Sequence, residues 1–338
     1  MSGSAAPVRL VQITDGSARR VALVDEPDLR LLAPAGSVYA LAMRAAADAV
    51  PLAVLAARQA TGERLDYEAV YHGASPWRLL PPLDHPAEPS RCLVSGTGLT
   101  HIGSARDRDA MHGPDDGALT DSMRMFRAGL EGGRPRPGAA GIAPEWFYKG
   151  TGSILRAHGE PLLVPDYAED GGEEAEIAGL YVIDLEGRPR RVGMAPGNEF
   201  SDHAYERRNY LHLAASKLRT CALGPEIALA PSFGSVPGDV WIERAGRRIW
   251  EKRIETGEDA MCHSLRNIEH HHFKFEGHRR PGDVHVHFLG AHSLSFGDGI
   301  VLRDGDVPGV AFEGFGRALR NIVRVERSAG TPVEVSPL

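Results

Sequence analysis

The chain has 338 residues, enough for two domains or for one large domain with an appendage. Its 38 basic and 45 acidic residues give a net charge of −7, which excludes a general attraction to nucleic acid and leaves a small molecule as the expected partner. No apolar stretch reaches the roughly 18 residues that a membrane helix needs, and the first residues lack the pattern of a secretory signal. We therefore expect a cytoplasmic protein with no membrane partner.

The beginning of the chain reads as a small α/β unit. Residues 8–24 form two apolar runs joined at Asp15-Gly16, which is typical of two short strands. A helical run is predicted from Ser37 to about Thr61, with Ala, Leu and Met on a repeating face and Pro51 interrupting it.

The clearest linker is the proline-rich segment 79–90, L-L-P-P-L-D-H-P-A-E-P-S. Prolines end regular structure and stiffen connections, so a domain boundary is expected there. The sequence thus predicts two domains, residues 1–85 and 86–338.

A strand is expected at residues 91–95, and the turn G-T-G-L-T-H that follows it carries His101. Glycines let the backbone approach a ligand closely, so His101 is a candidate acid/base group; the alternative is an ordinary surface histidine. A Gly- and Pro-rich loop, 132–141, then leads into P-E-W-F-Y-K at 144–149. Its consecutive aromatics indicate core packing, but Lys149 could instead meet an anionic substrate.

The segment G-G-E-E-A-E-I-A-G-L-Y-V-I carries the strongest chemical signal. Glu174 and Glu176 precede an apolar run, residues 177–183, that reads as a buried strand. Residues i and i+2 of a strand share a face, so the two carboxylates lie about 6 to 7 Å apart at their roots. Without a cation between them each would raise the pKa of the other, and oxygen ligands favour Mg²⁺, Mn²⁺ or Ca²⁺ over zinc. A solvated strand edge is the alternative.

A third carboxylate follows at a hairpin's distance. Glu199, in N-E-F-S, comes 23 residues after Glu176, so a hairpin can return it to the same site. Three carboxylates with water suit an octahedral Mg²⁺ that keeps positions open for substrate. Residues 204–218 are expected to be helical, which places Lys217 at the end of that helix.

Two groups of histidines suggest zinc at first sight. His270, His271 and His272 are consecutive, and consecutive residues of a helix point about 100° apart, so we expect a structural role for them. His285 and His287 share one face of a predicted strand, but no third ligand at suitable spacing is evident.

Taken in order, these segments resemble the fumarylacetoacetate hydrolase family. The turn before His101 resembles its G-x-N-Y-x-x-H segment, P-E-W-F-Y-K its P-x-x-F-x-K stretch, E-A-E-I-A its metal-binding E-x-E-L-A, and N-E-F-S its N-D-V-S. A lysine and G-P follow, as at Lys217 to Pro225, and P-G-D at 281–283 and E-G-F-G at 313–316 are similar to the final segments of the family.

Three departures narrow the function that this resemblance implies. Glu199 stands where the family has Asp, and Ala291 where it commonly has threonine. Ser104 stands where the hydrolases carry the glutamate of their water-activating His-Glu pair. Loss of that pair argues against C–C hydrolysis and leaves metal-assisted enolate chemistry intact.

The departures and the N-terminal unit make the chain most similar to the sugar-acid branch of the family, the 2-keto-3-deoxy-pentonate dehydratases. That resemblance implies an α+β fold, with a mixed β-sandwich roll as catalytic domain beside a small N-terminal α/β domain, in a homodimer or tetramer. It implies Mg²⁺ on Glu174, Glu176 and Glu199, and a 2-keto acid substrate. Catalytic roles are expected for His101 and Lys217, and substrate contacts are expected from Tyr148, Lys149, Ser201 and Lys217.

Two other functions remain open from the sequence. One is a hydrolase that cleaves an acylpyruvate or diketo sugar acid with a base supplied by Asp107, Asp109 or Glu145. The other is a catalytically silent keto-acid-binding protein, which the unusual residues Ser104 and Ala291 would fit.

Overall fold

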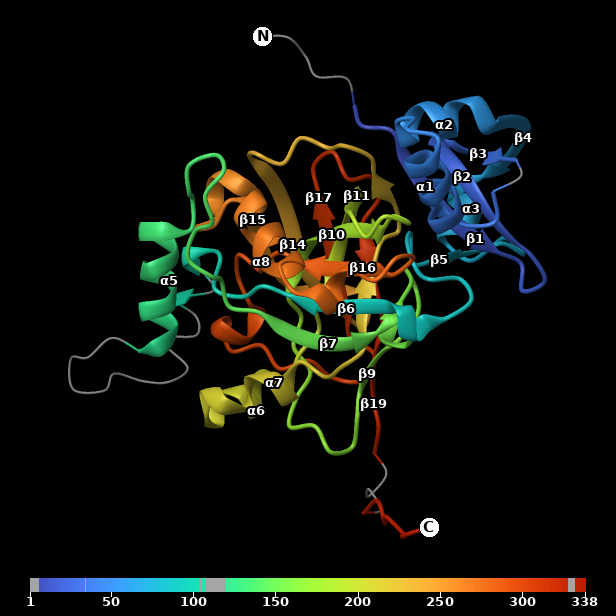
Figure 1. The fold of residues 1–338 in the computed structure, drawn as a ribbon. Helices are drawn as coiled ribbons and strands as arrows, with labels where there is room; N and C mark the ends of the chain where they lie inside the picture. The colour runs from blue at the N-terminus through green and yellow to red at the C-terminus, as the bar shows by residue number, and fades with distance from the viewer. Residues whose placement is uncertain (1–5, 34, 104, 107–119, 328–331) are drawn as a thin grey trace.

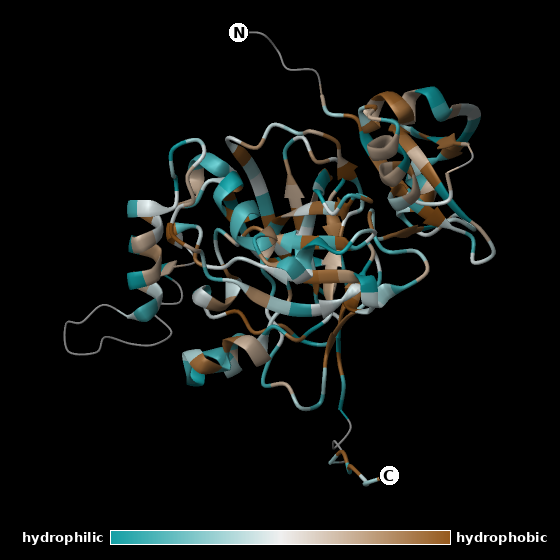
Figure 2. Ribbon diagram, in the orientation of Figure 1, coloured by the Kyte–Doolittle hydropathy of each residue, from teal (hydrophilic) through white to brown (hydrophobic). Residues whose placement is uncertain are grey.

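The computed structural model describes residues 6–33, 35–103, 105–106, 120–327 and 332–338 (Figure 1). Within these residues a small N-terminal unit lies beside a larger part that contains most of the strands. Hydrophobic residues gather on the strands of both parts (Figure 2). This is the pattern expected when strands form the core of each part.

One large sheet runs through both parts of the chain. Its described strands are β1 (Arg9–Thr14), β2 (Arg19–Asp25), β3 (Asp28–Leu32), β4 (Ala60–Asp66), β5 (Arg78–Leu80), β6 (Cys92–Gly96), β7 (Phe147–Thr151), β8 (Leu155–Arg156), β10 (Ala175–Ile183), β11 (Pro189–Asn198), β12 (Cys221–Leu223), β13 (Ile227–Ala228) and β16 (Val284–Phe288). They follow the order β4-β3-β2-β1-β13-β11-β10-β16-β6-β7, with β5, β8 and β12 beside this path. The sheet is mixed, because β16 pairs with β6, and β12 with β8, in parallel. The pairing of Arg9 with Ala228 joins β1 to β13, so the N-terminal strands extend the sheet of the larger part.

A second sheet stacks on the first. It has the order β15-β14-β17-β18, and β9 and β19 form a separate pair. These strands are β9 (Leu162–Val164), β14 (Val236–Arg244), β15 (Arg247–Thr256), β17 (Val307–Phe312), β18 (Leu319–Arg320) and β19 (Val323–Val325). Ile177 and Met194 of the large sheet share one apolar core with Val240 and Val310 of the second. Such packing of two inner faces is a β-sandwich, so the predicted α+β fold with a mixed β-sandwich is confirmed.

The helices of the N-terminal unit cover part of the large sheet. α1 (Val38–Ala47) begins after Ser37, whose hydroxyl caps it, and α2 (Leu52–Gln59) begins after Pro51. Their apolar residues share a core with β10 and β16. The predicted extension of this helical run to Thr61 is wrong, because β4 begins at Ala60 and pairs with β3. Backbone pairing with an available strand outweighs a weak helical preference at a helix end.

Further helices and turns lie among the described residues of the larger part and at the end of the N-terminal unit. They are α3 (Tyr67–Tyr71), α5 (Asp121–Gly132), α6 (His203–Arg208), α7 (Leu213–Ser216) and α8 (Leu265–Phe273), with 3-10 turns η1 (Pro89–Arg91), η2 (Gly152–Ile154), η3 (Tyr210–His212), η4 (Glu258–Ala260), η5 (Glu276–Arg279) and η6 (Ser295–Asp298). Among the described residues, no single helix is long and apolar enough to cross a membrane; α1 and α2 reach that length and composition only as a pair bent by 116°.

Candidate metal centre

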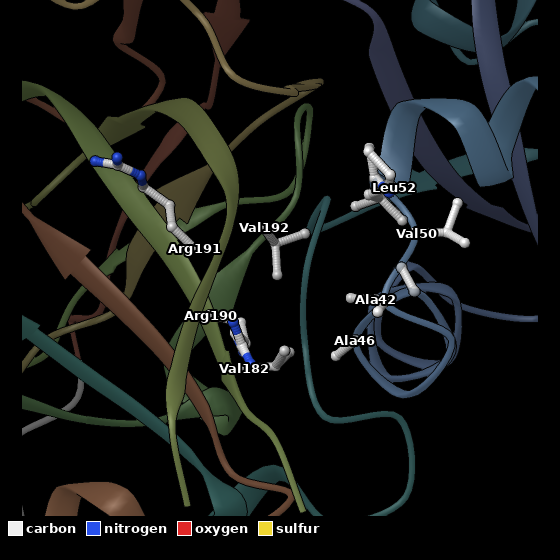
Figure 3. A pocket seen from close by; sticks show the side chains of 11 residues that line it. Ala42, Ala46, Val50, Leu52, Val182, Arg190, Arg191 and Val192 are labelled. Atoms are coloured by element: carbon white, nitrogen blue, oxygen red, sulfur yellow. The ribbon is translucent and has the colours of Figure 1, made fainter.

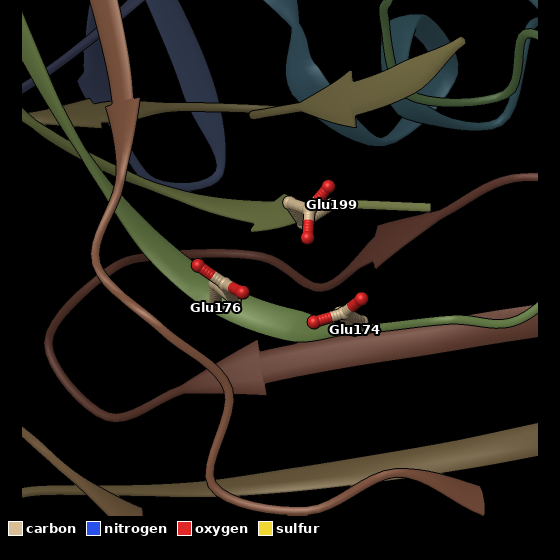
Figure 4. Close-up of side chains that lie close together, drawn as sticks. All are labelled: Glu174, Glu176 and Glu199. Atoms are coloured by element: carbon tan, nitrogen blue, oxygen red, sulfur yellow. The ribbon is translucent and has the colours of Figure 1, made fainter. Parts of the chain in front are cut away.

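The hairpin of β10 and β11 brings three glutamates together. Ala175 pairs with Asn198, so Glu174 and Glu199 lie just beyond the paired ends of the two strands, and the amide of Glu199 donates to the carbonyl of Glu174 at 2.9 Å. Glu176 follows two residues along β10, and Figure 4 shows the three carboxylates facing one another. One oxygen from each lies within 4.8 Å of the others. All three side chains are buried.

Two buried lysines hold these carboxylates. The ammonium of Lys217 contacts Glu174, lies 2.7 Å from an oxygen of Glu199 and 3.0 Å from the hydroxyl of Ser201. The predicted helix over 204–218 is broken at Asn209, whose extended backbone separates α6 from η3. Lys217 nevertheless directly follows α7, as the sequence indicated.

The second lysine, Lys149, makes mostly backbone contacts. Its ammonium contacts the carboxylate of Glu199 and lies 3.0 Å from the carbonyls of Glu199 and Phe200 and 2.9 Å from that of Lys217. An ammonium has three N–H donors, so these acceptors use its full capacity. Lys149 therefore ties β7 to the segment that carries Glu199.

The three carboxylates repel one another when all are ionised and no further cation lies among them. Burial, and then the charges of Glu199 and Glu174, raise the pKa of Glu176 well above its ordinary value. Burial and the charge of Glu174 likewise raise the pKa of Glu199, although both lysines act in the opposite direction. Three ionised carboxylates outnumber the two ammonium groups, so either a proton or a bound cation must neutralise the excess charge. The possible ligand atoms are all carboxylate oxygens. This donor set fits a hard divalent ion such as Mg²⁺, Mn²⁺ or Ca²⁺.

The loop after β16 closes over the glutamates. The amide of Gly290 donates to Glu176 at 2.7 Å, and the amide and hydroxyl of Ser295 donate to the buried carboxylate of Glu173 at 2.8 and 2.7 Å. Gly290 has a φ of +100°, and a Cβ there would lie 1.9 Å from the hydroxyl oxygen of Thr100. Only glycine fits this position, so it fixes the loop against the turn that precedes His101.

A second set of buried polar residues supports the site, and the sequence analysis missed it. His203 lies with its Nε2 3.1 Å from Glu174 Oε1. The preceding residue, Asp202, caps α6, accepts the amides of Glu169 and Asp170, and pairs with buried Arg219. These residues have no regular spacing in the sequence. The only local signal was the short run N-E-F-S-D-H, whose last two residues were left without a role.

His101 is buried in the turn after β6. Its ring nitrogens lie 2.9 Å from the hydroxyl of Thr100 and 3.0 Å from that of Thr256. Burial, with a smaller effect from His292, lowers the pKa of His101 to about 3. The imidazole is therefore neutral at physiological pH, and the alternative of an exposed surface histidine is wrong.

Of the other predicted site residues, some lie at the carboxylates and some do not. Ser201 lies at the carboxylates, where its hydroxyl also contacts Glu199. Tyr148 is 39% exposed, and the alternation of β7 turns it to the face opposite Lys149. Glu145 is buried and contacts Tyr210. The remaining candidates, Ser104, Asp107 and Asp109, lie outside the described residues.

The histidines that suggested zinc form a separate cluster between α8 and β16. His272 Nε2 lies 2.9 Å from His285 Nδ1, and His287 lies between the hydroxyls of Ser95 and Thr97 at 2.9 and 2.7 Å. Among the residues that the structure describes, only the three glutamates bring metal-ligand atoms of three residues together.

A groove lies apart from the carboxylates, where the turn between α1 and α2 faces β11 (Figure 3). It has a volume of about 390 Å³ and is lined mainly by alanine, valine and leucine. Arg190 and Arg191 form part of its wall, but they pair with Asp184 and Glu269. None of the three glutamates lines it.

The chain resembles known proteins in structure and not in sequence. No protein-family model matches the sequence, and no curated protein sequence is similar to it. Among solved structures, 2-keto-3-deoxy-D-arabinonate dehydratase in its apo form has a TM-score of 0.71 and 19% identity, over 95% of this chain and all of the other. Its complex with magnesium and 2,5-dioxopentanoate has a TM-score of 0.70, 19% identity and the same coverage. The 2-hydroxyhepta-2,4-diene-1,7-dioate isomerase from Mycobacterium marinum has a TM-score of 0.57 and 16% identity, also over 95% and 100%.

These likenesses span the N-terminal unit as well as the sandwich. The chain therefore has the fumarylacetoacetate hydrolase-like fold that the resemblance implied, and it shares this fold with 2-keto-3-deoxy-D-arabinonate dehydratase along nearly its whole length. At identities below 20% they establish this fold and leave the reaction to be argued from the site.

Proposed function

We propose that this protein is a metal-dependent dehydratase of a 2-keto-3-deoxy sugar acid. The 2-keto-3-deoxy-pentonates are the substrates to test first. The observation that carries the proposal is the buried set of Glu174, Glu176 and Glu199 on a fold shared with 2-keto-3-deoxy-D-arabinonate dehydratase. That enzyme has been seen with magnesium and 2,5-dioxopentanoate.

The three glutamates would hold Mg²⁺, Mn²⁺ or Ca²⁺. When bound, such an ion supplies Lewis-acid polarisation of the carboxylate and keto group of a 2-keto acid, which acidifies the C3 proton. Burial raises the pKa of both Glu176 and Glu199, so any proton that they hold would be released when an ion binds.

Lys217 is the residue best placed to act on the substrate. Its ammonium reaches both Glu174 and Glu199, so it lies where the C1–C3 end of a keto acid would meet these carboxylates. As an ammonium, Lys217 would orient the keto acid; to take the C3 proton it would first have to give up its own proton and act as the neutral amine. We assign Ser201 to a substrate contact and propose none for Tyr148, which lies on the face of β7 opposite Lys149. Lys149 orients Glu199, and the expected substrate contact from Lys149 would require one of its bonds to the protein to be exchanged for the substrate.

The C4 hydroxyl must leave as water, which requires a proton. His101 is proposed as its source. Because its imidazole is neutral, it would pass its N–H proton to the leaving hydroxyl and regain one from solvent. With the roles exchanged, the neutral imidazole would take the C3 proton and the ammonium of Lys217 would protonate the hydroxyl. Loss of the C3 proton and the C4 hydroxyl forms the C3–C4 double bond, and tautomerisation of the product of a pentonate gives 2,5-dioxopentanoate. A homodimer or tetramer in the cytoplasm remains our expectation for its assembly and location.

NMR of the products tests this proposal. Mg²⁺-loaded protein is incubated with the L- and D-2-keto-3-deoxy-pentonates, with and without EDTA, and with an acylpyruvate as the competing substrate. The dehydratase proposal predicts EDTA-sensitive formation of 2,5-dioxopentanoate from one of the sugar acids. Pyruvate released from the acylpyruvate, with no reaction of either sugar acid, would instead identify a hydrolase.

A further inference from the structure

His203 is a buried residue at the carboxylates to which neither the sequence motifs nor the proposed reaction assigns a role. It is the first residue of α6 and is 1% exposed. Its Nε2 lies 3.1 Å from Glu174 Oε1. A carboxylate oxygen only accepts, so the ring must donate from Nε2 in this contact.

The side chain of Glu174 is held differently from those of its two companions. Glu176 lies within β10 and accepts a hydrogen bond from the amide of Gly290. Glu199 forms ion pairs with both Lys149 and Lys217. Glu174 stands one residue before β10, and its side chain contacts His203 and Lys217 through the same oxygen, Oε1. These two donors fix the carboxylate from one side.

The surroundings of His203 hold its ring in this orientation by shape. A Cβ on Gly172 would lie 2.1 Å from Nδ1, so the edge of the ring sits directly against the backbone there. The ring of Phe296 packs on it at 5.4 Å between centroids. Nδ1 is buried and has no hydrogen-bond partner among the described residues. The one nitrogen that the ring uses in a described hydrogen bond is therefore the one that faces Glu174.

We propose that His203 is a positioning residue of the metal centre: it donates to Glu174 Oε1 and so turns this carboxylate toward Glu176 and Glu199. The inference rests on the proposed function, because it requires that the three glutamates bind a divalent ion. Hydrogen-bonded partners of metal ligands are worth about 10- to 100-fold in metal affinity.

The test uses two amides of different reach and a metal readout that needs no substrate. The amide nitrogen of glutamine reaches the position of Nε2, whereas that of asparagine reaches only the position of Nδ1. We therefore expect His203→Asn to weaken Mn²⁺ binding by about 10- to 100-fold, measured by electron paramagnetic resonance of unbound Mn²⁺, and His203→Gln to retain most of it. His270→Asn, a change at an exposed histidine of α8, is the matched control.

Unfolding in EDTA by circular dichroism shows that each variant is folded at the temperature of the titration. Wild-type affinity in folded His203→Asn would overturn the inference, and so would an equal loss in His203→Asn and His203→Gln. A wild-type protein that binds no Mn²⁺ would overturn the metal centre itself, which distinguishes failure of the proposed function from failure of the role of His203.

Discussion

Replacing Lys149 by methionine tests how the structure holds its third glutamate. Methionine keeps much of the apolar stem and removes the ammonium, which leaves the carboxylate of Glu199 without one of its two cations and the carbonyls of Phe200 and Lys217 without this donor. Breaking a buried ion pair by removing one partner costs about 3–5 kcal/mol. For a chain of 338 residues, whose entropy of unfolding is about 0.7 kcal/mol/K, that corresponds to a fall of about 4–7 °C in Tm.

The assay is urea unfolding of the protein in EDTA, followed by Mn²⁺ titration of the same variant. Lys252→Met is the matched control, because Lys252 is exposed and lies 3.4 Å from Asp298; its change should stay within about 0.5 kcal/mol. If Lys149→Met keeps wild-type stability and Mn²⁺ affinity but raises KM, the structural reading of Lys149 is refuted and a direct substrate contact is supported.

Three further results are expected. Glu176→Gln should abolish Mn²⁺ binding and the Mg²⁺-dependent gain in stability, which is about 2.7 kcal/mol at 100 times Kd for the wild type. It should not destabilise the metal-free protein, because burial and the charges of Glu199 and Glu174 already disfavour the ionised form of Glu176. Isothermal titration and urea unfolding check this, and a metal-free variant that retained activity would refute the site. Lys217→Gln should lower kcat by about 10²- to 10⁴-fold and still bind Mn²⁺ by the same titration, whereas unchanged kcat would remove Lys217 from the reaction. Burial and the neighbouring imidazole of His278 lower the pKa of His285 to about 3. The neutral form of His285 therefore stabilises the fold above about pH 6.5, and this contribution falls by up to about 1.4 kcal/mol per pH unit as the pH drops from about 6.5 to about 3. In urea titrations, the free energy of unfolding of the wild type minus that of His285→Phe should decline as the pH is lowered over this range, and a difference independent of pH would contradict the prediction.

The carboxylate site could be predicted because its signals are local. Glu174 and Glu176 sit two residues apart before an apolar strand, and a hairpin returns Glu199 to the paired end. The sequence also predicts correctly that Lys217 follows the end of a helix, even though the predicted helix is broken at Asn209. In each case spacing along the chain translates directly into proximity.

The supporting contacts could not be read in this way. His203 contacts Glu174, which is 29 residues away in the sequence, and Lys149 contacts Glu199, which is 50 residues away. No periodic pattern in the sequence predicts either contact. The end of α2 was missed for a related reason, since β4 is defined by pairing with β3 and its own residues are mostly exposed. Partners that are distant in sequence decide these features, so only the folded chain reveals them.

The central claim, that the three glutamates form a metal centre, is tested most directly by crystals grown with Mn²⁺ and measured for anomalous scattering. The account predicts one strong anomalous peak bound by oxygens of Glu174, Glu176 and Glu199, with the ammonium of Lys217 beside it. A peak elsewhere, such as among His272, His285 and His287, or no peak with the lysine still bridging Glu174 and Glu199, would contradict it.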